Sequence, residues 1–463
     1  MSMRIEKDTL GEMKLPAGAL YGASTQRAVE NFKISGVVVP IEIVHALVEI
    51  KLCAAEVNRD LGHLPAKHTK LIQAAAREVL KGGHDVQFVV DVFQTGSGTS
   101  TNMNVNEVLA NLANQAAGSD LGAKSPVHPN DHVNLGQSSN DVFPSAIHMA
   151  LVGSIHQVLL LTLEALGKSL EGKAGEFMSI VKIGRTHLQD ATPLFLGQEF
   201  SGYAAQMVRA TERLRSMEKR LLELALGGTA VGTGINTDPK FARLVCKKLV
   251  ERTGYAFTEA KNHFEAQSAR DACVELSGVL KTIAVSLYKI GNDIRLLASG
   301  PRSGLGELEL PTVQPGSSIM PGKSNPVIIE SLLQVCAQVV GNDGAVTWGG
   351  ASGHFELNTM MPLIGYNLLQ SIHWLGNVIV AFDEKCVRGI TANRDRIASS
   401  VENSLMLVTA LVPEIGYEKA AELANLAHKT GESVRTVVMR ELKWSEEKID
   451  KTLDPPTLCR PHS

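Results

Sequence analysis

Serine, lysine and asparagine side chains that can act on a small anion are grouped in the segment Gly316–Pro326, GSSIMPGKSNP. Lys323 supplies a point positive charge, and Asn325 supplies an amide donor directly before a proline and a long apolar run. The Asn-Pro pair predicts a helix start, where free backbone N–H groups and the helix dipole also favour an anion. We therefore expect this segment to stabilise negative charge that develops during a reaction.

Four further polar segments that contain glycine separate the apolar stretches of the chain. Serine, threonine and asparagine supply neutral donors, and glycine leaves backbone N–H groups accessible, a combination that suits small carboxylates. Any one of these segments taken alone is explained as well by ordinary turn chemistry. Together with Gly300–Asn325, the segments are Gln94–Asn104, His128–Asp141, Gly184–Thr192 and Gly227–Thr237.

Two other kinds of site can be rejected from the spacing of residues. Gly322-Lys323-Ser324 imitates the end of a phosphate-binding loop, but Gly316 lies one residue too far upstream, Pro321 occupies the loop and no apolar strand precedes it. The 14 histidines include no H-E-x-x-H motif and no cluster with cysteine, so we expect no metal.

The composition of the 463 residues predicts a folded, soluble protein, with 44% hydrophobic and 20% charged residues. A net charge of −3 argues against general binding to nucleic acid or an anionic membrane. The amino-terminal segment has no apolar core of a signal peptide, and no window reaches 18 uninterrupted apolar residues, so we expect a cytoplasmic location without a membrane span. The cysteines lack metal spacing and are expected to be reduced core thiols, at positions 53, 246, 273, 336, 386 and 459.

Hydrophobic periodicity predicts a mainly α-helical protein built around a bundle of long helices. Asp238-Pro239 predicts a helix start, Gly254 a helix end, and short strands are expected only near Ile180–Ile183 and near the amino terminus. Steps of three and four residues favour long helices that pack at a shallow angle. The clearest stripe consists of Cys273, Leu276, Leu280, Ile283, Leu287, Ile290, Ile294 and Leu297; two others are Ile155, Leu159, Leu163, Leu166, Leu170 and Met207, Leu214, Met217, Leu221, Leu224.

The segment GSSIMPGKSNP resembles the signature loop of the fumarase/aspartase superfamily, and the other polar segments match that family in order and spacing. The resemblance extends from RIEKDTLG near the amino terminus to SLMLVTAL and GY-x-KAAELA near the carboxyl terminus. It implies three mostly helical domains, 1–137, 138–395 and 396–463. It also implies a homotetramer with a twenty-helix core and active sites that are each shared by three subunits.

The resemblance implies hydration of fumarate to (S)-malate by anti addition of water, without a metal or organic cofactor. The reverse reaction removes a weakly acidic proton next to a carboxylate and leaves an aci-carboxylate with additional negative charge. Ser317 is implied to be the base, which requires backbone N–H groups and a cationic field around its alkoxide. His187 is implied to act on the hydroxyl through a water, with Glu330 accepting its second N–H and Lys323 stabilising charge.

The resemblance also assigns two sets of binding residues. His128, Asn130 and Asp131, in the motif HPND, resemble a second dicarboxylate site, although a capped helix start explains this motif equally well. The substrate site is implied to comprise Ser97, Thr99, Ser138, Ser139, Asn140, Thr186, Ser318 and Asn325.

Two alternatives to the hydratase remain open at this point. Aspartate ammonia-lyases of the same superfamily share most loops but tend to carry glutamine at the position of His187 and alanine at that of Gly322. A non-catalytic scaffold is the other alternative. The joint presence of five residues argues against it, namely Ser317, Lys323, Asn325, His187 and Glu330. The chain also departs from the family pattern at Ser324, where valine is usual, and at Leu135-Gly136, which removes a positive charge near a substrate loop.

Overall fold

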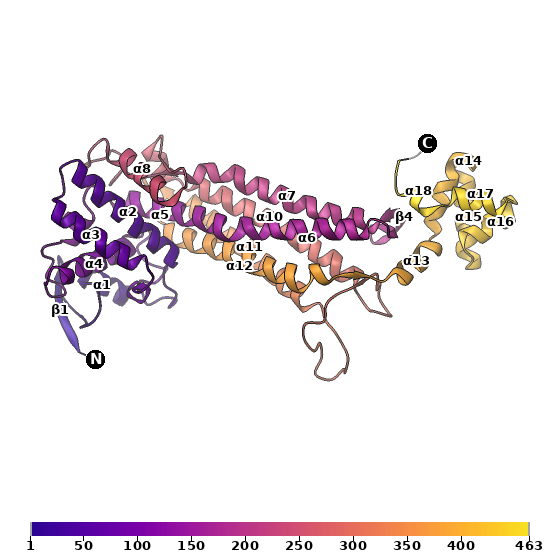
Figure 1. The fold of residues 1–463 in the computed structure, drawn as a ribbon, viewed down its shortest axis with the longest axis horizontal. Helices are drawn as coiled ribbons and strands as arrows, with labels where there is room; N and C mark the ends of the chain where they lie inside the picture. Colours follow the sequence, from indigo (N-terminus) through magenta and orange to yellow (C-terminus); the bar gives the residue numbers. More distant parts are fainter. Residues whose placement is uncertain (1, 462–463) are drawn as a thin grey trace. The chain divides into compact units, whose positions relative to one another are not determined.

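The computed structural model describes residues 2–461 as a mainly α-helical chain with short strands, which confirms the expected fold class (Figure 1). Its internal contacts divide it into two compact units, each assembled from three stretches of sequence. The first unit comprises Met1–Leu160, Glu212–Thr282 and Ala337–Leu375, and the second comprises Leu161–Thr211, Ile283–Cys336 and Gly376–Ser463. The division of the sequence into three domains stays a prediction.

The first unit is built on α2 (Ile41–Asp60), which packs against α3 (Ala66–Val79), α5 (Ser139–Ser154) and α8 (Phe241–Thr253). Helix α4 (Thr99–Ala116) packs against α3 and brings its first turn close to that of α5. The shorter elements of this unit are β1 (Met3–Asp8), β2 (Gly11–Pro16), α1 (Ala23–Asn31), η1 (Asp85–Gln87), η2 (Pro129–Val133), η3 (Ile155–Leu159), β5 (Glu223–Leu224), β6 (Thr258–Glu259), α9 (His263–Ser268), β8 (Gly353–His354) and β9 (Leu357–Asn358).

Five long helices contribute residues to both units. They are α6 (Leu160–Phe177), α7 (Leu196–Leu221), α10 (Asp271–Leu297), α11 (Val327–Ala351) and α12 (Met361–Lys385). Of these, α6 has only Leu160 in the first unit, and α6, α7 and α10 carry most of the predicted apolar stripes. The second unit also contains β3 (Val181–Thr186), β4 (Gln189–Phe195), β7 (Leu308–Glu309), η4 (Val387–Gly389), β10 (Thr391–Ala392), α13 (Arg394–Glu402), η5 (Leu405–Leu411), α14 (Val412–Ile415), α15 (Tyr417–Thr430), α16 (Val434–Leu442), α17 (Glu446–Thr452) and α18 (Pro455–Leu458).

Strands are as sparse as the sequence predicts. Over residues 2–461 they form five two-stranded sheets, of which β5–β6 is parallel and the other four are antiparallel. The expected strands near the amino terminus and near Ile180–Ile183 are β1, β2 and β3. The sheets are therefore small two-stranded pairings, and the helices supply the hydrophobic core.

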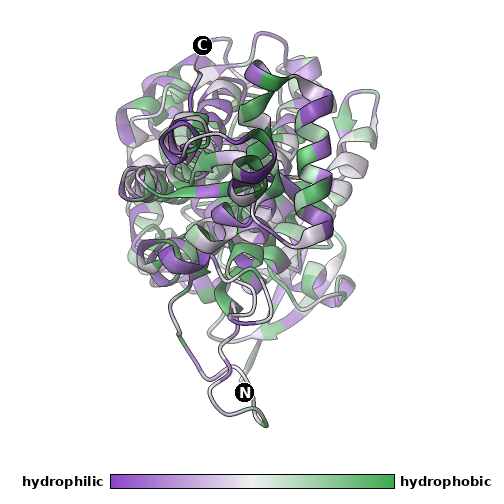
Figure 2. Cartoon of the chain, turned by 90° about the vertical axis from the view of Figure 1, so that its right-hand side faces the viewer, coloured by the Kyte–Doolittle hydropathy of each residue, from purple (hydrophilic) through white to green (hydrophobic). Residues whose placement is uncertain are grey.

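The predicted stripe on α10 is confirmed as core, because all eight of its residues are buried. In the second unit Gly291 allows α11 to approach α10 closely, since an added Cβ would lie 3.1 Å from the Ile329 side chain. In the first unit Ser277 Oγ donates to Asp343 Oδ1 of α11 at 2.8 Å. Figure 2 shows the corresponding pattern along the helices, with hydrophobic and hydrophilic residues interleaved. The other two stripes are also buried.

Helix ends follow the predictions only in part. Gly254 ends α8 in the left-handed conformation as expected, with φ of 78°. The predicted start at Asp238 is wrong, because Asp238 Oδ1 accepts a hydrogen bond from Lys240 N at 2.8 Å and closes a turn, so that α8 begins only at Phe241. The third stripe also overshoots its helix, since Leu224 lies in β5 beyond the end of α7.

The helical segment Ser139–Phe177 is long and apolar enough to cross a membrane by length and composition alone. Within the protein, however, 61% of its most apolar window is buried. The core helix of a folded protein satisfies the same criteria, and the partners of α5 in the first unit identify it as such a helix.

All six cysteines are buried and unpaired, as predicted. Burial raises the pKa of the Cys53, Cys246, Cys336 and Cys386 thiols to about 12. Thiols held in this way are protonated and unreactive, so they act as small core side chains.

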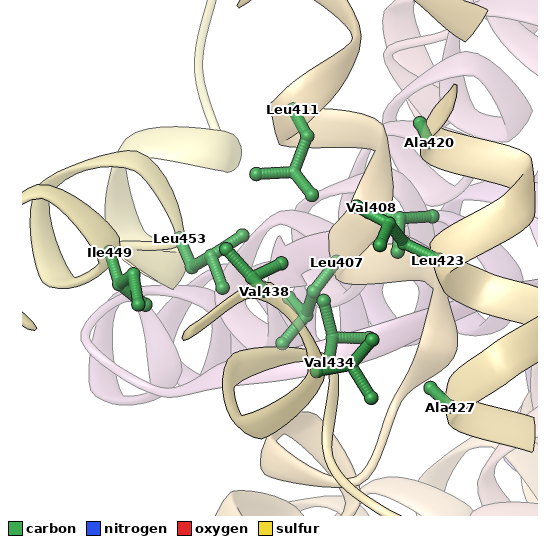
Figure 3. Close-up of a cluster of buried hydrophobic side chains, with 11 residues drawn as sticks. Leu407, Val408, Leu411, Ala420, Leu423, Ala427, Val434, Val438, Ile449 and Leu453 are labelled. Atoms are coloured by element: carbon green, nitrogen blue, oxygen red, sulfur yellow. The ribbon is translucent and has the colours of Figure 1, made fainter. Parts of the chain in front are cut away.

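A separate apolar cluster holds the carboxyl-terminal helices together. Figure 3 shows side chains from η5, α15, α16 and α17 that point toward one another. Its members are Leu407, Val408, Leu411, Ala420, Leu423, Ala427, Val434, Val437, Val438, Ile449 and Leu453.

Substitution Leu411→Ala tests this cluster, because Leu411 is fully buried. Removing its side chain leaves a cavity, and we expect a loss of about 2–5 kcal/mol in the free energy of unfolding of these helices. Hydrogen exchange of α15 and α16 measures the change. Tyr417→Ala, at a largely exposed position on α15, serves as the control. Equal protection in the two variants would show that the cluster does not stabilise this region.

Candidate active site

The start of α5 is held by a capping box. Ser138 Oγ accepts from Asn140 N at 3.2 Å, and Ser138 N donates to Asp141 Oδ1 at 2.9 Å. The fully buried Asp141 also accepts through Oδ2 from Gly227 N at 3.1 Å and Thr229 N at 3.0 Å. Two of the polar segments identified in the sequence, His128–Asp141 and Gly227–Thr237, are therefore in contact at this helix start.

Ser139 and Asn140 are the first residues of α5, and both are anchored. Asn140 Nδ2 donates to Ala230 O at 2.8 Å, and Ser139 Oγ accepts from Asn102 Nδ2 of α4 at 3.0 Å. These bonds fix the helix start relative to its neighbours and place side-chain hydroxyl and amide groups at the positive end of the helix dipole. A carboxylate is the ligand that such an arrangement favours.

The segment before α4 presents two hydroxyl groups together. Ser97 Oγ and Thr99 Oγ1 lie 2.8 Å apart. Gly98 between them adopts a left-handed conformation with φ of 71°, and an added Cβ would lie 2.3 Å from the Phe143 ring. Only glycine fits this turn, so it fixes the two hydroxyls at the start of α4.

The HPND motif has two explanations from the sequence, a second dicarboxylate site and a capped helix start. The structure shows the capped start. His128 precedes η2, a short π-helical turn, and its Nδ1 accepts from Asp131 N at 3.2 Å. His128 N donates in turn to His132 Nδ1 at 2.8 Å. Asn130 and Asp131 are exposed. Whether these residues also hold a dicarboxylate stays a prediction.

Thr186 and His187 lie at the tip of the β3–β4 hairpin in the second unit. The strands pair Thr186 with Gln189, so the turn contains only His187 and Leu188, with φ of 56° and 61°. Both signs are those of a type I′ turn, which usually contains asparagine and glycine. A histidine held in this strained conformation is typical of a functional position, and its side chain is exposed.

The base of this hairpin carries a buried charge network. Glu307 is almost fully buried and accepts from Arg185 Nη2 at 2.5 Å, while Lys182 Nζ lies 3.4 Å from its other oxygen. Lys182 Nζ also lies 2.9 Å from Glu199 Oε2 on α7. The network lines a cleft of about 470 Å³ that reaches Thr186 and Leu188. It anchors the hairpin whose tip presents His187.

The loop Gly316–Pro326 is closed on itself. Ser317 Oγ accepts from Ile319 N at 3.2 Å and from Met320 N at 3.0 Å. Lys323 Nζ donates to Asn325 Oδ1 at 2.7 Å. Two backbone N–H groups aimed at one hydroxyl oxygen favour its alkoxide, which is the environment that a serine base requires.

The sequence predicts that Asn325 caps the following helix, but its side chain does not do so. Its Oδ1, the atom that would cap the helix, accepts from Lys323 Nζ at 2.7 Å, and its Nδ2 donates to Gly316 O at 2.5 Å. Helix α11 begins two residues later, at Val327. Glu330 lies in the first turn of α11 and is exposed. Within residues 2–461 of one chain, Glu330 and His187 form no hydrogen bond, so this pairing stays a prediction for an assembly.

The predicted residues thus fall into a donor group in the first unit and a reactive group in the second. The donor group comprises Ser97, Thr99, Ser138, Ser139 and Asn140. The reactive group comprises Thr186, His187, Ser317, Ser318, Lys323, Asn325 and Glu330. Over the described residues 2–461, no set of three His, Cys, Asp or Glu side chains could hold a metal ion.

Sequence reasoning missed the polar residues beneath the donor group. Asp141 could have been found from the S-x-x-D spacing that starts at Ser138, which is a capping-box signal. Lys51 stands within the apolar run of α2, where a single charge is easily taken for an exposed position. Asn102 and Asn134 lie in segments identified as polar, but nothing in their spacing indicates that they contact each other.

Comparison with known proteins gives matches along nearly the whole chain. The family model described as Lyase matches residues 11–341, and that described as Fumarase C C-terminus matches residues 407–460. The chain is 53% identical to a fumarate hydratase class II of Methylorubrum extorquens, with 99% of this chain and 97% of the relative covered. It is 52% identical to the mitochondrial fumarate hydratase of Rattus norvegicus, with 99% and 91% covered. The crystal structure of a class II fumarase from Schistosoma mansoni covers 100% of both chains at 41% identity, with a TM-score of 0.97.

Substitution Glu307→Gln tests the anchoring of the hairpin. It leaves Lys182 and Arg185 without their buried carboxylate, and we expect a loss of roughly 3–5 kcal/mol in the free energy of unfolding, measured in urea. Glu309→Gln is the matched control, because this exposed residue lies two positions later. If both variants unfold at the same urea concentration, the buried network does not anchor the hairpin.

Proposed function

The chain belongs to the lyase family that includes the class II fumarate hydratases, and on this premise we propose that it adds water reversibly to fumarate to give (S)-malate. The observation that supports the chemistry most directly is the pair of backbone N–H groups that Ser317 Oγ accepts. No other position in the loop Gly316–Pro326 combines a hydroxyl that accepts from two backbone N–H groups with a lysine within six residues.

The donor group of the first unit holds the substrate carboxylates. Hydroxyl groups at the starts of α4 and α5, together with the amide of Asn140, donate to one end of the diacid. Thr186 and Ser318 complete the set from the hairpin and the loop. Neutral donors suit this task because they can be buried without a large desolvation cost and keep a fixed orientation.

In the dehydration direction, the Ser317 alkoxide removes the proton from the carbon next to one carboxylate. The electron pair of the broken C–H bond moves into that carboxylate and forms the aci-carboxylate. Lys323, and the free N–H groups at the start of α11, stabilise the additional charge. Asn325 holds Lys323 in place through its Oδ1. Closure of the loop over the substrate excludes water and strengthens each of these interactions.

His187 acts on the opposite face of the substrate. The C–O bond breaks as a water bound to His187 delivers a proton to the departing hydroxyl, which leaves as water. Glu330 accepts the second N–H of His187 and raises its basicity. The proton held by Ser317 returns to solvent, and the water bound to His187 takes one proton back from solvent, so that malate yields only fumarate and water. The reverse sequence gives anti addition.

A homotetramer in which three subunits share each active site accounts for the arrangement of these groups. The reactive loop, the hairpin tip and Glu330 are exposed in the single chain, although the chemistry requires a dry pocket. The long helices also expose apolar side chains, among them Val208, Val285 and Trp348, the last of them 76% exposed. Packing of these helices into a shared twenty-helix core would bury both sets of residues.

Three further features belong to the proposal. The reaction uses no metal and no organic cofactor. His128, Asn130 and Asp131 form a second dicarboxylate site at the start of η2. The protein acts in the cytoplasm, which six buried, unpaired cysteines support because disulfides are rare in reducing compartments.

Substitution Ser317→Ala tests the base. We expect kcat for malate dehydration to fall roughly 10²–10⁴-fold, because proton removal loses its acceptor. The ultraviolet absorbance of fumarate follows the reaction, and His187→Asn should also lower kcat. Ser303→Ala, an exposed serine in the same long segment, is the control. Near-normal turnover by Ser317→Ala would reject the base assignment.

Aspartate provides the test against the related ammonia-lyase activity. The unmodified protein should convert malate to fumarate without added metal and should release no ammonia from aspartate. Robust deamination of aspartate with no reaction of malate would reject the hydratase, and inactivity with both would indicate a scaffold.

Mixed tetramers test whether subunits share sites. Ser317→Ala and His187→Asn tetramers are each expected to be inactive. If each site takes these two residues from different subunits, some sites in a mixed tetramer receive Ser317 from a His187→Asn subunit and His187 from a Ser317→Ala subunit. After dissociation, mixing and reassembly at equal amounts, we expect about a quarter of the unmodified activity. Activity that stays at the level of the separate variants would place both residues in one subunit.

A further inference from the structure

Lys51 of α2 is among the largest fully buried side chains, although lysine is almost never buried without a partner. Its Nζ donates to Asn134 Oδ1 at 2.7 Å, just after η2. The segment Asn134–Gln137 contains no charged residue of its own. The positive charge next to the segment Asn134–Gln137 is therefore supplied by Lys51 of α2.

A chain of hydrogen bonds leads from Lys51 to the substrate site. Asn134 Oδ1 also accepts from Asn102 Nδ2 at 3.3 Å, and the same Asn102 amide donates to Ser139 Oγ at 3.0 Å. Asn134 Nδ2 donates to Gln137 O at 3.1 Å. The chain runs from a cation through two amides to a hydroxyl that is implicated in substrate binding.

The direction of each bond follows from Lys51. A protonated lysine can only donate, so Asn134 must turn its oxygen toward it and its N–H groups away. Asn102 must then present N–H groups to Asn134, and its own Oδ1 is buried without a partner. With Asn102 donating to its oxygen, Ser139 keeps its O–H free to donate outward.

We propose that Lys51 is a positioning residue for the substrate dianion, acting through Asn134 and Asn102 to fix Ser139 as a hydrogen-bond donor to a carboxylate. This inference rests on the proposed function. Removing Lys51 frees Asn134 to rotate, and Ser139 can then turn its O–H inward. Binding of the carboxylate then loses an oriented donor.

The ionisation of Lys51 is sensitive to a bound anion. Burial lowers its pKa to about 7, and the buried carboxylate of Asp141 on α5 partly opposes this shift. A bound dianion favours the charged form further. Other titratable groups on the elements that pack against α2 include the stacked His68 and His132, His148 of α5, and Lys248 and Arg252 of α8, which pair with Glu56 and Glu49 of α2.

Substitution Lys51→Met removes the charge and keeps a flexible side chain of similar length. We expect KM for fumarate, and Kd for the unreactive diacid succinate measured by calorimetry, to rise about 10–100-fold. The value of kcat should change less than about threefold, because the lost interaction is made equally before and during the reaction. Lys248→Met, at a half-buried lysine paired with Glu56 of α2, is the matched control and should change neither constant. An unchanged Kd for succinate in Lys51→Met would overturn the proposal.

A double-mutant cycle separates this role from a purely structural one. If Lys51 acts through Ser139, then Lys51→Met should weaken succinate binding less than about twofold in a Ser139→Ala background. An equal loss in both backgrounds would mean that Lys51 does not act through Ser139, and would overturn the proposal.

In the unmodified protein, succinate should bind more weakly at pH 8.5 than at pH 6.5, since Lys51 loses its proton. That dependence should be smaller in Lys51→Met, and an identical pH dependence counts against the proposal.

Asn102→Ala gives an independent test should Lys51→Met fail to fold. It removes the donor to Ser139 Oγ without touching the buried charge, and its effect on Kd should likewise disappear in the Ser139→Ala background. Succinate binding is measured without turnover. Failure of the unmodified protein to hydrate fumarate would therefore reject the proposed function alone, whereas additive losses in succinate binding would reject only this inference.

Discussion

The buried carboxylate of Asp141 is the constraint on which the donor side of the site depends. It accepts from Ser138 N at the start of α5 and from two backbone N–H groups in a segment 86 and 88 residues later. Burial raises its pKa, while the three N–H groups favour the ionised form. Without this carboxylate, three backbone donors would lie in the core with no acceptor, so the segments could not stay together. The positions of Ser139 and Asn140 follow from that junction.

The sequence predicts the helical core well because burial imposes a regular period. The stripe from Cys273 to Leu297 is buried throughout, as a helix in a bundle requires. Local polar interactions were harder to predict. Asp238 closes a turn instead of capping α8, and Asn325 closes its own loop, because a side chain with several possible partners is committed only by tertiary contacts.

The candidate site was predictable to the extent that its residues lie in recognisable polar segments. The hydroxyls of Ser97 and Thr99 are adjacent, and Ser317 receives backbone donors, both consistent with their expected roles. The buried residues that support the site were not predictable, since Lys51 follows an apolar pattern and its partner Asn134 is 83 residues away. The strained turn at His187 also gives no signal of the usual Asn-Gly type.

The two cations of the proposed site differ in a way that divides binding from catalysis. Lys51 is fully buried on a core helix, and in our proposal it acts on the substrate only through oriented amides, equally for the substrate and for the intermediate. Lys323 lies on an exposed loop, and in the proposed mechanism it takes its place when that loop closes. An interaction that is equal in both states lowers KM, whereas one that strengthens as charge develops raises kcat. A rigid helix is suited to the first task and a loop that carries the proposed base to the second, and on this proposal the two charges are supplied by different elements for that reason.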